Sequence, residues 1–305
     1  MSQKLDAVVA EIGTVLLGKQ VQVRLSLCCM IAGGHLLIED LPGMGKTTLA
    51  HALANVFGLA FNRIQFTSDM LPADILGVSV FEPKTGEFSF HQGPIFSQLI
   101  LADEVNRTTP KTQSALLEAM EEGQVSIEGE TRSLPSPFFV IATQNPVSLA
   151  GTFALPESQL DRFLMRIGIG YPDPAAERKL LEECDQRDRG ESISQLLQVS
   201  DLVSLRQVAG QVKMSAQLLD YVQRLIEKTR TMNNVFFGLS PRGSLAIVRA
   251  AKAWALMAGR MHVEPEDVQA ILPSVIEHRL SASGQGEGHS VDSIAQKILD
   301  EVDVI

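Results

Sequence analysis

The chain has 305 residues, of which 45% are hydrophobic and 5% aromatic, so it is long enough for one large or two moderate globular domains. Its formal net charge is −10 and it has no run of basic residues, which disfavours general nucleic-acid binding. No secretory signal is evident and the longest apolar stretch is too short to cross a bilayer, so we expect a cytoplasmic protein without stable membrane insertion.

The first predicted elements are helical. An amphipathic N-terminal helix is followed by an apolar helical pattern that contains Cys28 and Cys29. Together with Cys184 the cysteines are odd in number, which makes buried free thiols a better expectation than disulfides or a metal site.

A phosphate-binding loop follows. An apolar strand is predicted over Leu36–Ile38 and a helix over Thr48–Val56, with a glycine-containing loop between them. Gly43 and Gly45 would allow backbone N–H groups to turn toward phosphates, and Lys46 would reach the β- and γ-phosphates. This arrangement of strand, loop and helix predicts a nucleoside triphosphate site.

Two further positions in this segment bear on that prediction, one in support and one as a departure from the general pattern. The Thr47 hydroxyl is suited to coordinating Mg²⁺. Asp40 stands where the general phosphate-loop pattern has a glycine, so its carboxylate must be turned away from the phosphates. The alternative for this segment alone is a tight strand-to-helix turn with an ordinary surface lysine.

Further strands and two hairpins complete the predicted α/β core. Apolar runs at Leu99–Ala102 and Phe138–Ala142 have the continuity of strands covered on both faces of a parallel sheet. Alternating segments near residues 78–90 and 125–134 predict β-hairpins, the second after a helix that begins at Pro110 and is followed by Gly123. Neither hairpin belongs to a plain α/β alternation.

Strand signals end near residues 172–176, where we place a domain boundary. Apolar residues at helical spacing then predict a smaller helical domain. Ser281 to Ser290 is rich in Gly and Ser and reads as a loop before a final helix. The expected domains are residues 1–173, with inserts at about 71–95 and 124–136, and residues 174–305.

Three polar residues follow the predicted strands of the sheet. Asp103 and Glu104 would lie at the same edge as the phosphate loop, with Asp103 holding Mg²⁺ and Glu104 orienting the attacking water. Asn145 is suited to bonding that water or a γ-phosphate oxygen. The alternatives are a solvated strand end for the acids and a turn residue for Asn145.

Arginines beyond the sheet are the other candidates. Arg162 could neutralise transition-state charge from across a subunit boundary, although an ion pair with Asp161 is an alternative and Arg166 competes for the role. Ser240 and a proline place Arg242 in the first turn of a helix, where its charge opposes the helix dipole. We therefore expect an anion near Arg242, with a solvated arginine as the alternative.

These motifs occur in the order found in AAA+ ATPases. Their amino-acid sequences resemble those of the MoxR family, and the resemblance covers nearly the whole chain. The segments that carry the MoxR resemblance are His35-Leu36-Leu37-Ile38-Glu39-Asp40-Leu41-Pro42-Gly43, Leu101-Ala102-Asp103-Glu104-Val105-Asn106-Arg107 and Ala142-Thr143-Gln144-Asn145-Pro146. Leu160-Asp161-Arg162-Phe163 and Ser240-Pro241-Arg242 complete the AAA+ order. An acid at position 40 is usual in that family.

The resemblance implies an α/β AAA+ core with a helical lid, ATP and Mg²⁺ bound between them, and a ring, typically hexameric. Arg162 would reach the neighbour's γ-phosphate, and Arg242 would be the lid's phosphate sensor. Gly18 and Lys19 resemble the segment that closes over adenine. The nucleotide-binding residues expected in all are Gly18, Lys19, Asp40, Pro42, Gly43, Met44, Gly45, Lys46, Thr47, Thr48 and Asp103.

Members of the family are thought to mature or activate protein complexes, often by metal or cofactor insertion, with proteins that carry a von Willebrand factor A (VWA) domain. The expected function is therefore a chaperone-like ATPase. The alternatives are a motor that remodels DNA, which the acidic charge disfavours, and a nucleotide switch that hydrolyses little, which an intact Glu104 disfavours.

Overall fold

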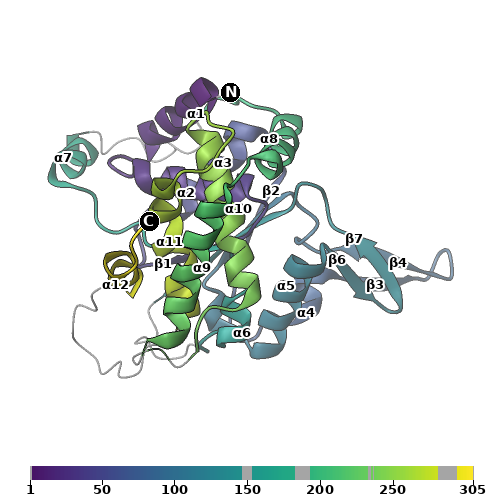
Figure 1. The fold of residues 1–305 in the computed structure, drawn as a ribbon. Helices are drawn as coiled ribbons and strands as arrows, with labels where there is room; N and C mark the ends of the chain where they lie inside the picture. Colours follow the sequence, from purple (N-terminus) through teal and green to yellow (C-terminus); the bar gives the residue numbers. More distant parts are fainter. Residues whose placement is uncertain are drawn as a thin grey trace.

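A five-stranded parallel sheet forms the centre of the molecule (Figure 1). The computed structural model describes residues 2–145, 153–182, 193–232, 235, 237–280 and 294–304. The sheet has the order β2-β5-β8-β1-β9, and every neighbouring pair is parallel. Its strands are β1 (Leu36–Glu39), β2 (Phe61–Gln65), β5 (Leu99–Asp103), β8 (Phe139–Gln144) and β9 (Met165–Ile167). The predicted α/β class is confirmed.

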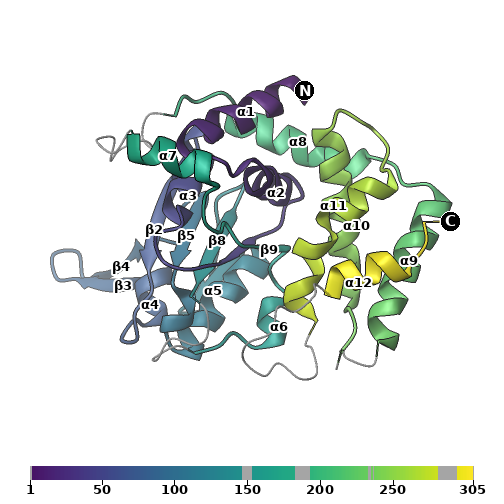
Figure 2. The ribbon, with the colours of Figure 1, turned by 90° about the vertical axis from the view of Figure 1, so that its left-hand side faces the viewer.

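Helices cover both faces of this sheet (Figure 2). Alternate residues of β5 contribute to different cores, because successive side chains of a strand point to opposite faces. Leu99 and Leu101 join the cluster with α1 to α3, whereas Ile100 and Ala102 join the cluster with α5. The helices of this part are α1 (Ser2–Val15), α2 (Gln20–Ile31), α3 (Lys46–Phe57), α4 (Pro72–Leu76), η1 (Val105–Arg107), α5 (Pro110–Glu122) and α6 (Glu157–Leu160).

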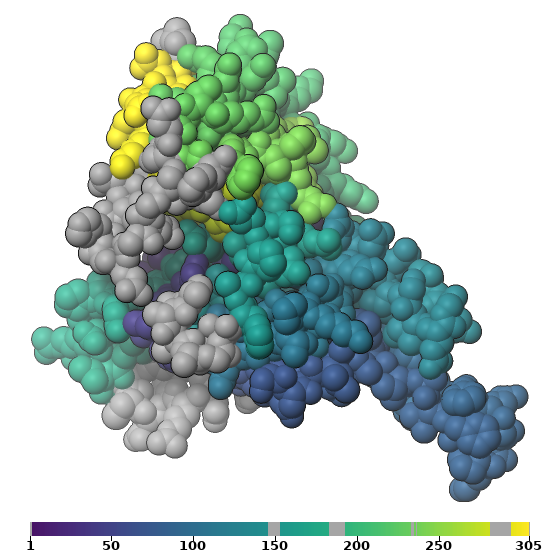
Figure 3. Space-filling model, turned by 90° about the horizontal axis from the view of Figure 1, so that it is seen from below, coloured from purple at the N-terminus to yellow at the C-terminus, as the bar shows by residue number. Residues whose placement is uncertain are grey.

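Both predicted hairpins form. β3 (Gly77–Glu82) pairs with β4 (Glu87–Gln92), and β6 (Gln124–Ile127) pairs with β7 (Glu130–Ser133), each in antiparallel register. The β3–β4 hairpin projects far from the body of the molecule (Figure 3). Its exposed side chains include Phe81 and Phe88, which lie against each other with ring centroids 5.3 Å apart.

The C-terminal part is helical, as expected. α10 packs on α11, α8 and α2, and α11 contacts β9, so these helices cover the β9 edge of the sheet (Figure 2). The chain leading into α8 bonds to the carbonyl of Val56 at the end of α3. The helices are α7 (Pro174–Glu182), α8 (Val199–Gln211), α9 (Ala216–Thr231), α10 (Pro241–Met257), α11 (Pro265–Ile276), η3 (Glu277–Arg279) and α12 (Ile294–Glu301).

The thiols of Cys28 and Cys29 are buried and free, which confirms that expectation for these two residues. Cys184 and the loop predicted at Ser281 to Ser290 lie outside the described residues. Among the helices that the structure describes, none is both long and apolar enough to span a membrane.

Candidate active site

A cavity of about 490 Å³ lies over the loop between β1 and α3. It is lined by Pro42, Gly43, Gly45, Lys46, Thr47, Thr48, Arg63, Gln65, Asp103, Glu104 and Asn145. The loop, β5 and β8 meet here because the carboxyl ends of parallel strands share one edge of the sheet. Nine of these eleven residues, all but Arg63 and Gln65, are predicted site residues, so the predicted phosphate loop and the predicted acids line one space.

The loop backbone has the geometry that phosphate binding requires. Gly43 and Gly45 have φ angles of 84° and 87°, in the left-handed region that glycine adopts without a steric penalty. α3 begins at Lys46, so the free N–H groups of its first turn and the positive end of its dipole lie beside the cavity. This backbone fits a nucleotide phosphate.

The side chains of Lys46 and Asp40 are both held by hydrogen bonds to main-chain groups. The Lys46 ammonium donates to the Asp40 carbonyl oxygen at 2.5 Å. The Asp40 carboxylate accepts from the backbone N–H groups of Leu41 at 2.8 Å and Gly170 at 2.5 Å. Burial lowers the pKa of Lys46, and the carboxylates of Asp40 and Asp103 oppose that shift. A partly buried cation with one neutral acceptor is suited to receiving an anion.

Asp103 is held by two donors at the end of β5. Thr143 on the adjacent β8 donates from Oγ1 to Asp103 Oδ1 at 2.6 Å, and Arg63 donates to Oδ2 at 2.6 Å. A carboxylate has about four acceptor positions, so Asp103 keeps capacity for a further ligand. Its oxygens and the Thr47 hydroxyl line one cavity and are the hard donors that Mg²⁺ prefers. These residues fit that ion.

Glu104 is fixed more tightly than its neighbour. Its backbone adopts φ 57° and ψ 48°, a conformation that few non-glycine residues adopt. Asn145 donates to Oε1 at 2.8 Å, while Gln65 at 3.0 Å and Arg107 at 2.9 Å donate to Oε2. A carboxylate oriented by three donors inside a phosphate cavity is arranged to position a water molecule.

Arg63 and Gln65 are site residues that we did not predict. Both lie on β2, which the sequence analysis did not predict, and they hold Asp103 at the end of β5 and Glu104 directly after it. The signal available was weak: polar residues alternating in a short segment before the first hairpin.

A second cavity of about 280 Å³ also adjoins the loop. Gly43, Met44 and Gly45 line it together with Leu16, Leu17, Lys19 and Gly170. Lys19 donates to the Tyr171 carbonyl at 2.5 Å, and Gly18 has φ 71°. The structure thus brings the Gly18–Lys19 segment beside the phosphate loop, where a space with an apolar lining could take a nucleotide base.

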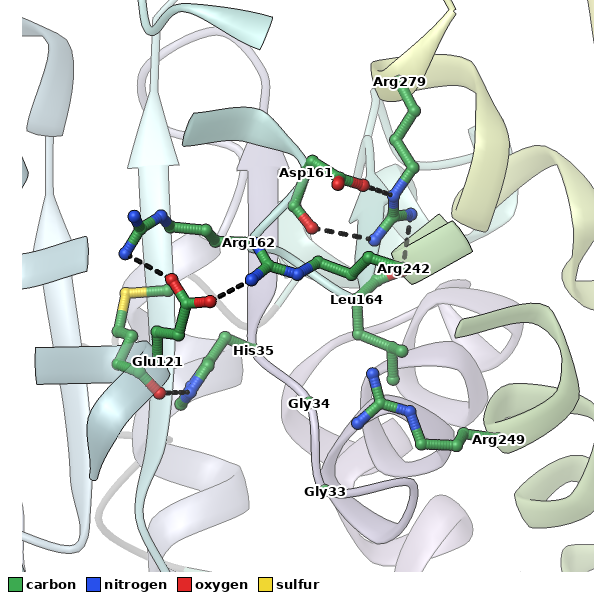
Figure 4. A pocket seen from close by; sticks show the side chains of 11 residues that line it. Gly33, Gly34, His35, Glu121, Asp161, Arg162, Leu164, Arg242, Arg249 and Arg279 are labelled. Carbon is green, nitrogen blue, oxygen red and sulfur yellow. Dashed lines mark hydrogen bonds and ion pairs between the residues drawn. The ribbon is translucent and has the colours of Figure 1, made fainter. Parts of the chain in front are cut away.

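Arg162 and Arg242 lie in a third cavity, of about 210 Å³ (Figure 4). Ser240 caps α10 by accepting from the Gly243 N–H, which places Arg242 in the first turn as predicted. The anion that faces Arg242 is the Glu121 carboxylate, which also pairs with Arg162 at 2.7 Å. Among the described residues that line the phosphate cavity, neither arginine is present.

The phosphate cavity and the cavity that holds Arg162 and Arg242, called here the arginine cavity, lie at opposite ends of β1. Gly33, Gly34 and His35, just before the strand, line the arginine cavity, whereas the phosphate loop follows the strand. The four residues of β1 alone span about 13 Å. The start of α10, which carries Arg242, packs at the end of β1 away from the phosphate loop, and the role of Arg242 as the lid's phosphate sensor stays a prediction.

Arg166 has a different environment from Arg162. It lies on β9, where it pairs with Glu39 at 2.7 Å and Glu277 at 3.7 Å. Two carboxylates already face its guanidinium, which makes it the weaker candidate for an anion-binding arginine.

A glycine loop at a helix N-terminus, a partly buried lysine and an oriented acid pair at the edge of a parallel sheet define a P-loop ATPase. Comparison with known proteins agrees. Residues 35–165 match the ATPase family associated with various cellular activities (AAA), and residues 227–298 match the AAA lid domain.

Similarity extends over nearly the whole chain. The protein YeaC of Bacillus subtilis (strain 168) is 43% identical, covering 98% of this chain and 94% of the relative. The chaperone MoxR1 of Mycobacterium tuberculosis is 39% identical, covering 98% and 79%. A crystal structure of a protein from Cytophaga hutchinsonii is 36% identical, with a TM-score of 0.90 and coverage of 99% and 95%. The chain belongs to the MoxR family of AAA+ ATPases.

Proposed function

We propose that this ATPase forms rings, hydrolyses ATP with Mg²⁺, and acts as a chaperone-like remodeller that matures a protein complex. The placement of Arg162 and Arg242 carries the ring proposal. Both are separated from the phosphate loop of their own protomer by the length of β1. An arginine that stabilises the transition state must contact the transferring phosphoryl group, so these two would serve the nucleotide of a neighbour.

Within one protomer the chemistry divides among residues of the phosphate cavity. Lys46 and the N–H groups of the loop would hold the β- and γ-phosphates. Thr47 and Asp103 would hold Mg²⁺, which supplies charge neutralisation at the phosphate oxygens. Glu104 would orient the attacking water, because Asn145 and Gln65 fix its carboxylate.

The client side of the proposal rests on relatives and on the hairpins. MoxR1 is a chaperone by name and is similar over 98% of this chain. The β3–β4 hairpin projects with exposed Phe81 and Phe88, which suits contact with protein. Acidic residues at both hairpin ends, Glu82 with Glu87 and Glu128 with Glu130, disfavour a DNA backbone as client. A VWA-domain protein is the proposed partner, with metal or cofactor insertion into the client as a candidate outcome.

The proposal is tested by mixing two inactive variants. Lys46→Ala protomers would bind nucleotide poorly but keep their arginines, while Arg162→Ala protomers would keep a complete phosphate cavity. Mixed assemblies should regain turnover, because a Lys46→Ala protomer supplies Arg162 to its neighbour's site. Verified mixed assemblies that stay inactive at every ratio would contradict an arginine acting between subunits.

A further inference from the structure

One carboxylate in the arginine cavity contacts two arginines from distant parts of the chain (Figure 4). Glu121 lies in the last turn of α5. Its Oε2 pairs with Arg162, which follows α6, at 2.7 Å, and its Oε1 pairs with Arg242 at the start of α10. Each arginine therefore has its own oxygen, and the carboxylate lies between the two guanidinium groups (Figure 4).

The position of Arg162 is set by a second contact. Its Nη1 donates to the Leu117 carbonyl at 2.9 Å, one turn before Glu121 on the same helix. Its Nε is buried and has no acceptor within the described residues. Glu121 and the end of α5 thus orient this guanidinium while leaving part of its bonding capacity unused.

The cavity carries excess positive charge. Four arginines line it, Arg162, Arg242, Arg249 and Arg279, against the carboxylates of Glu121 and Asp161. Asp161 is bonded to Arg279 at 2.7 Å. One carboxylate cannot neutralise both Arg162 and Arg242, and Arg249 has no ion pair among the described residues. A further anion would therefore be attracted here.

We propose that Glu121 is a positioning residue that holds Arg162 and Arg242 together so that both reach the phosphates of a neighbouring protomer. This inference rests on the proposed action of arginines between subunits. Two guanidinium groups repel each other, and long arginine side chains have many rotamers. A shared carboxylate offsets the repulsion and fixes the spacing of the pair, leaving its net charge positive.

The test uses the mixed assemblies, with Glu121→Gln placed on one side at a time. On the Lys46→Ala protomer, which supplies the arginines, it should lower the regained kcat about 10- to 100-fold, because misplaced catalytic groups are that costly. On the Arg162→Ala protomer, which supplies the nucleotide site, it should have little effect. The KM for ATP should change less than kcat in both, since Lys46 and the loop N–H groups that would hold the phosphates are intact in the protomer that supplies the nucleotide site.

Matched controls separate positioning from folding. Glu122→Gln makes the same change one residue along α5, at an exposed position, and should leave the regained kcat unchanged on either side. Glu121→Asp keeps the charge on a shorter side chain. On the Lys46→Ala protomer it should give a kcat between the value without a change at Glu121 and the value with Glu121→Gln.

Three results would overturn the proposal. Full kcat with the Glu121→Gln donor would show that the arginines need no shared carboxylate. Equal losses with Glu121→Gln on either side would indicate a general structural role. No regained turnover with the unmodified donor would remove the action between subunits and this inference with it, a failure that is distinguishable because it appears before Glu121 is changed.

Discussion

The stability of the protein should depend on pH through His35, which precedes β1. His35 Nδ1 accepts from the Val140 N–H at 3.0 Å, so the proton of the neutral ring is on Nε2, which donates to the Met120 carbonyl at 3.0 Å. Burial lowers the pKa of His35 from its ordinary value of 6.5 to about 4. Protonation would also place a second donor against the Val140 N–H.

The direction in which stability changes with pH follows from proton binding. Between pH 6.5 and 4 the unfolded chain binds a proton at this histidine that the folded protein excludes, so stability is lost as the pH falls through that range. A pKa lowered from 6.5 to about 4 corresponds to at most about 3 kcal/mol in the free energy of unfolding.

Urea unfolding followed by the fluorescence of Trp254, the single tryptophan, measures this effect. We compare the wild type with His35→Gln, whose amide can still donate to Met120 but does not titrate. The variant should lose less stability than the wild type between pH 7 and pH 4, by up to about 3 kcal/mol. His262→Gln, at an exposed histidine, should keep the wild-type dependence. Parallel curves for wild type and His35→Gln would refute the reasoning.

Three further variants test the site and its support. Lys46→Ala removes a charge-assisted contact of about 1.5–3 kcal/mol and should weaken ATP binding by calorimetry about 10- to 100-fold; wild-type affinity would exclude Lys46 from the phosphate site. Glu104→Gln should bind ATP normally but release phosphate about 10²- to 10⁴-fold more slowly, and an unchanged rate would assign the water to another group. Asp161→Asn leaves the buried Arg279 without its carboxylate and should lower the free energy of unfolding by about 3–5 kcal/mol, whereas a loss below about 1 kcal/mol would mean that the pair contributes little.

The sequence predicted the buried strands well because β1, β5 and β8 are covered on both faces and read as continuous apolar runs. It missed β2 and β9. β2 is an edge strand in which Ile64 alone is buried, so its pattern resembles a loop. β9 has three residues, too few for a period to show.

The same physical reasons explain which site residues could be predicted from the sequence and which could not. Asp103, Glu104 and Asn145 could be placed together because they follow strands that share one edge of a sheet. Gln65 could not, since its role depends on the unrecognised β2. The pairing of Arg242 with Glu121 depends on how α10 packs against the end of α5, and local periodicity carries no information on packing between distant helices.

The most direct test of the proposed ring mechanism is ATP turnover per protomer measured across protein concentration with Mg²⁺ present, with the assembled fraction determined by sizing at each point. Because the structure places Arg162 and Arg242 at the far end of β1 from the phosphate loop, turnover per protomer should rise in proportion to the assembled fraction. Full turnover by isolated protomers at the lowest concentration would contradict an active site completed by a neighbour.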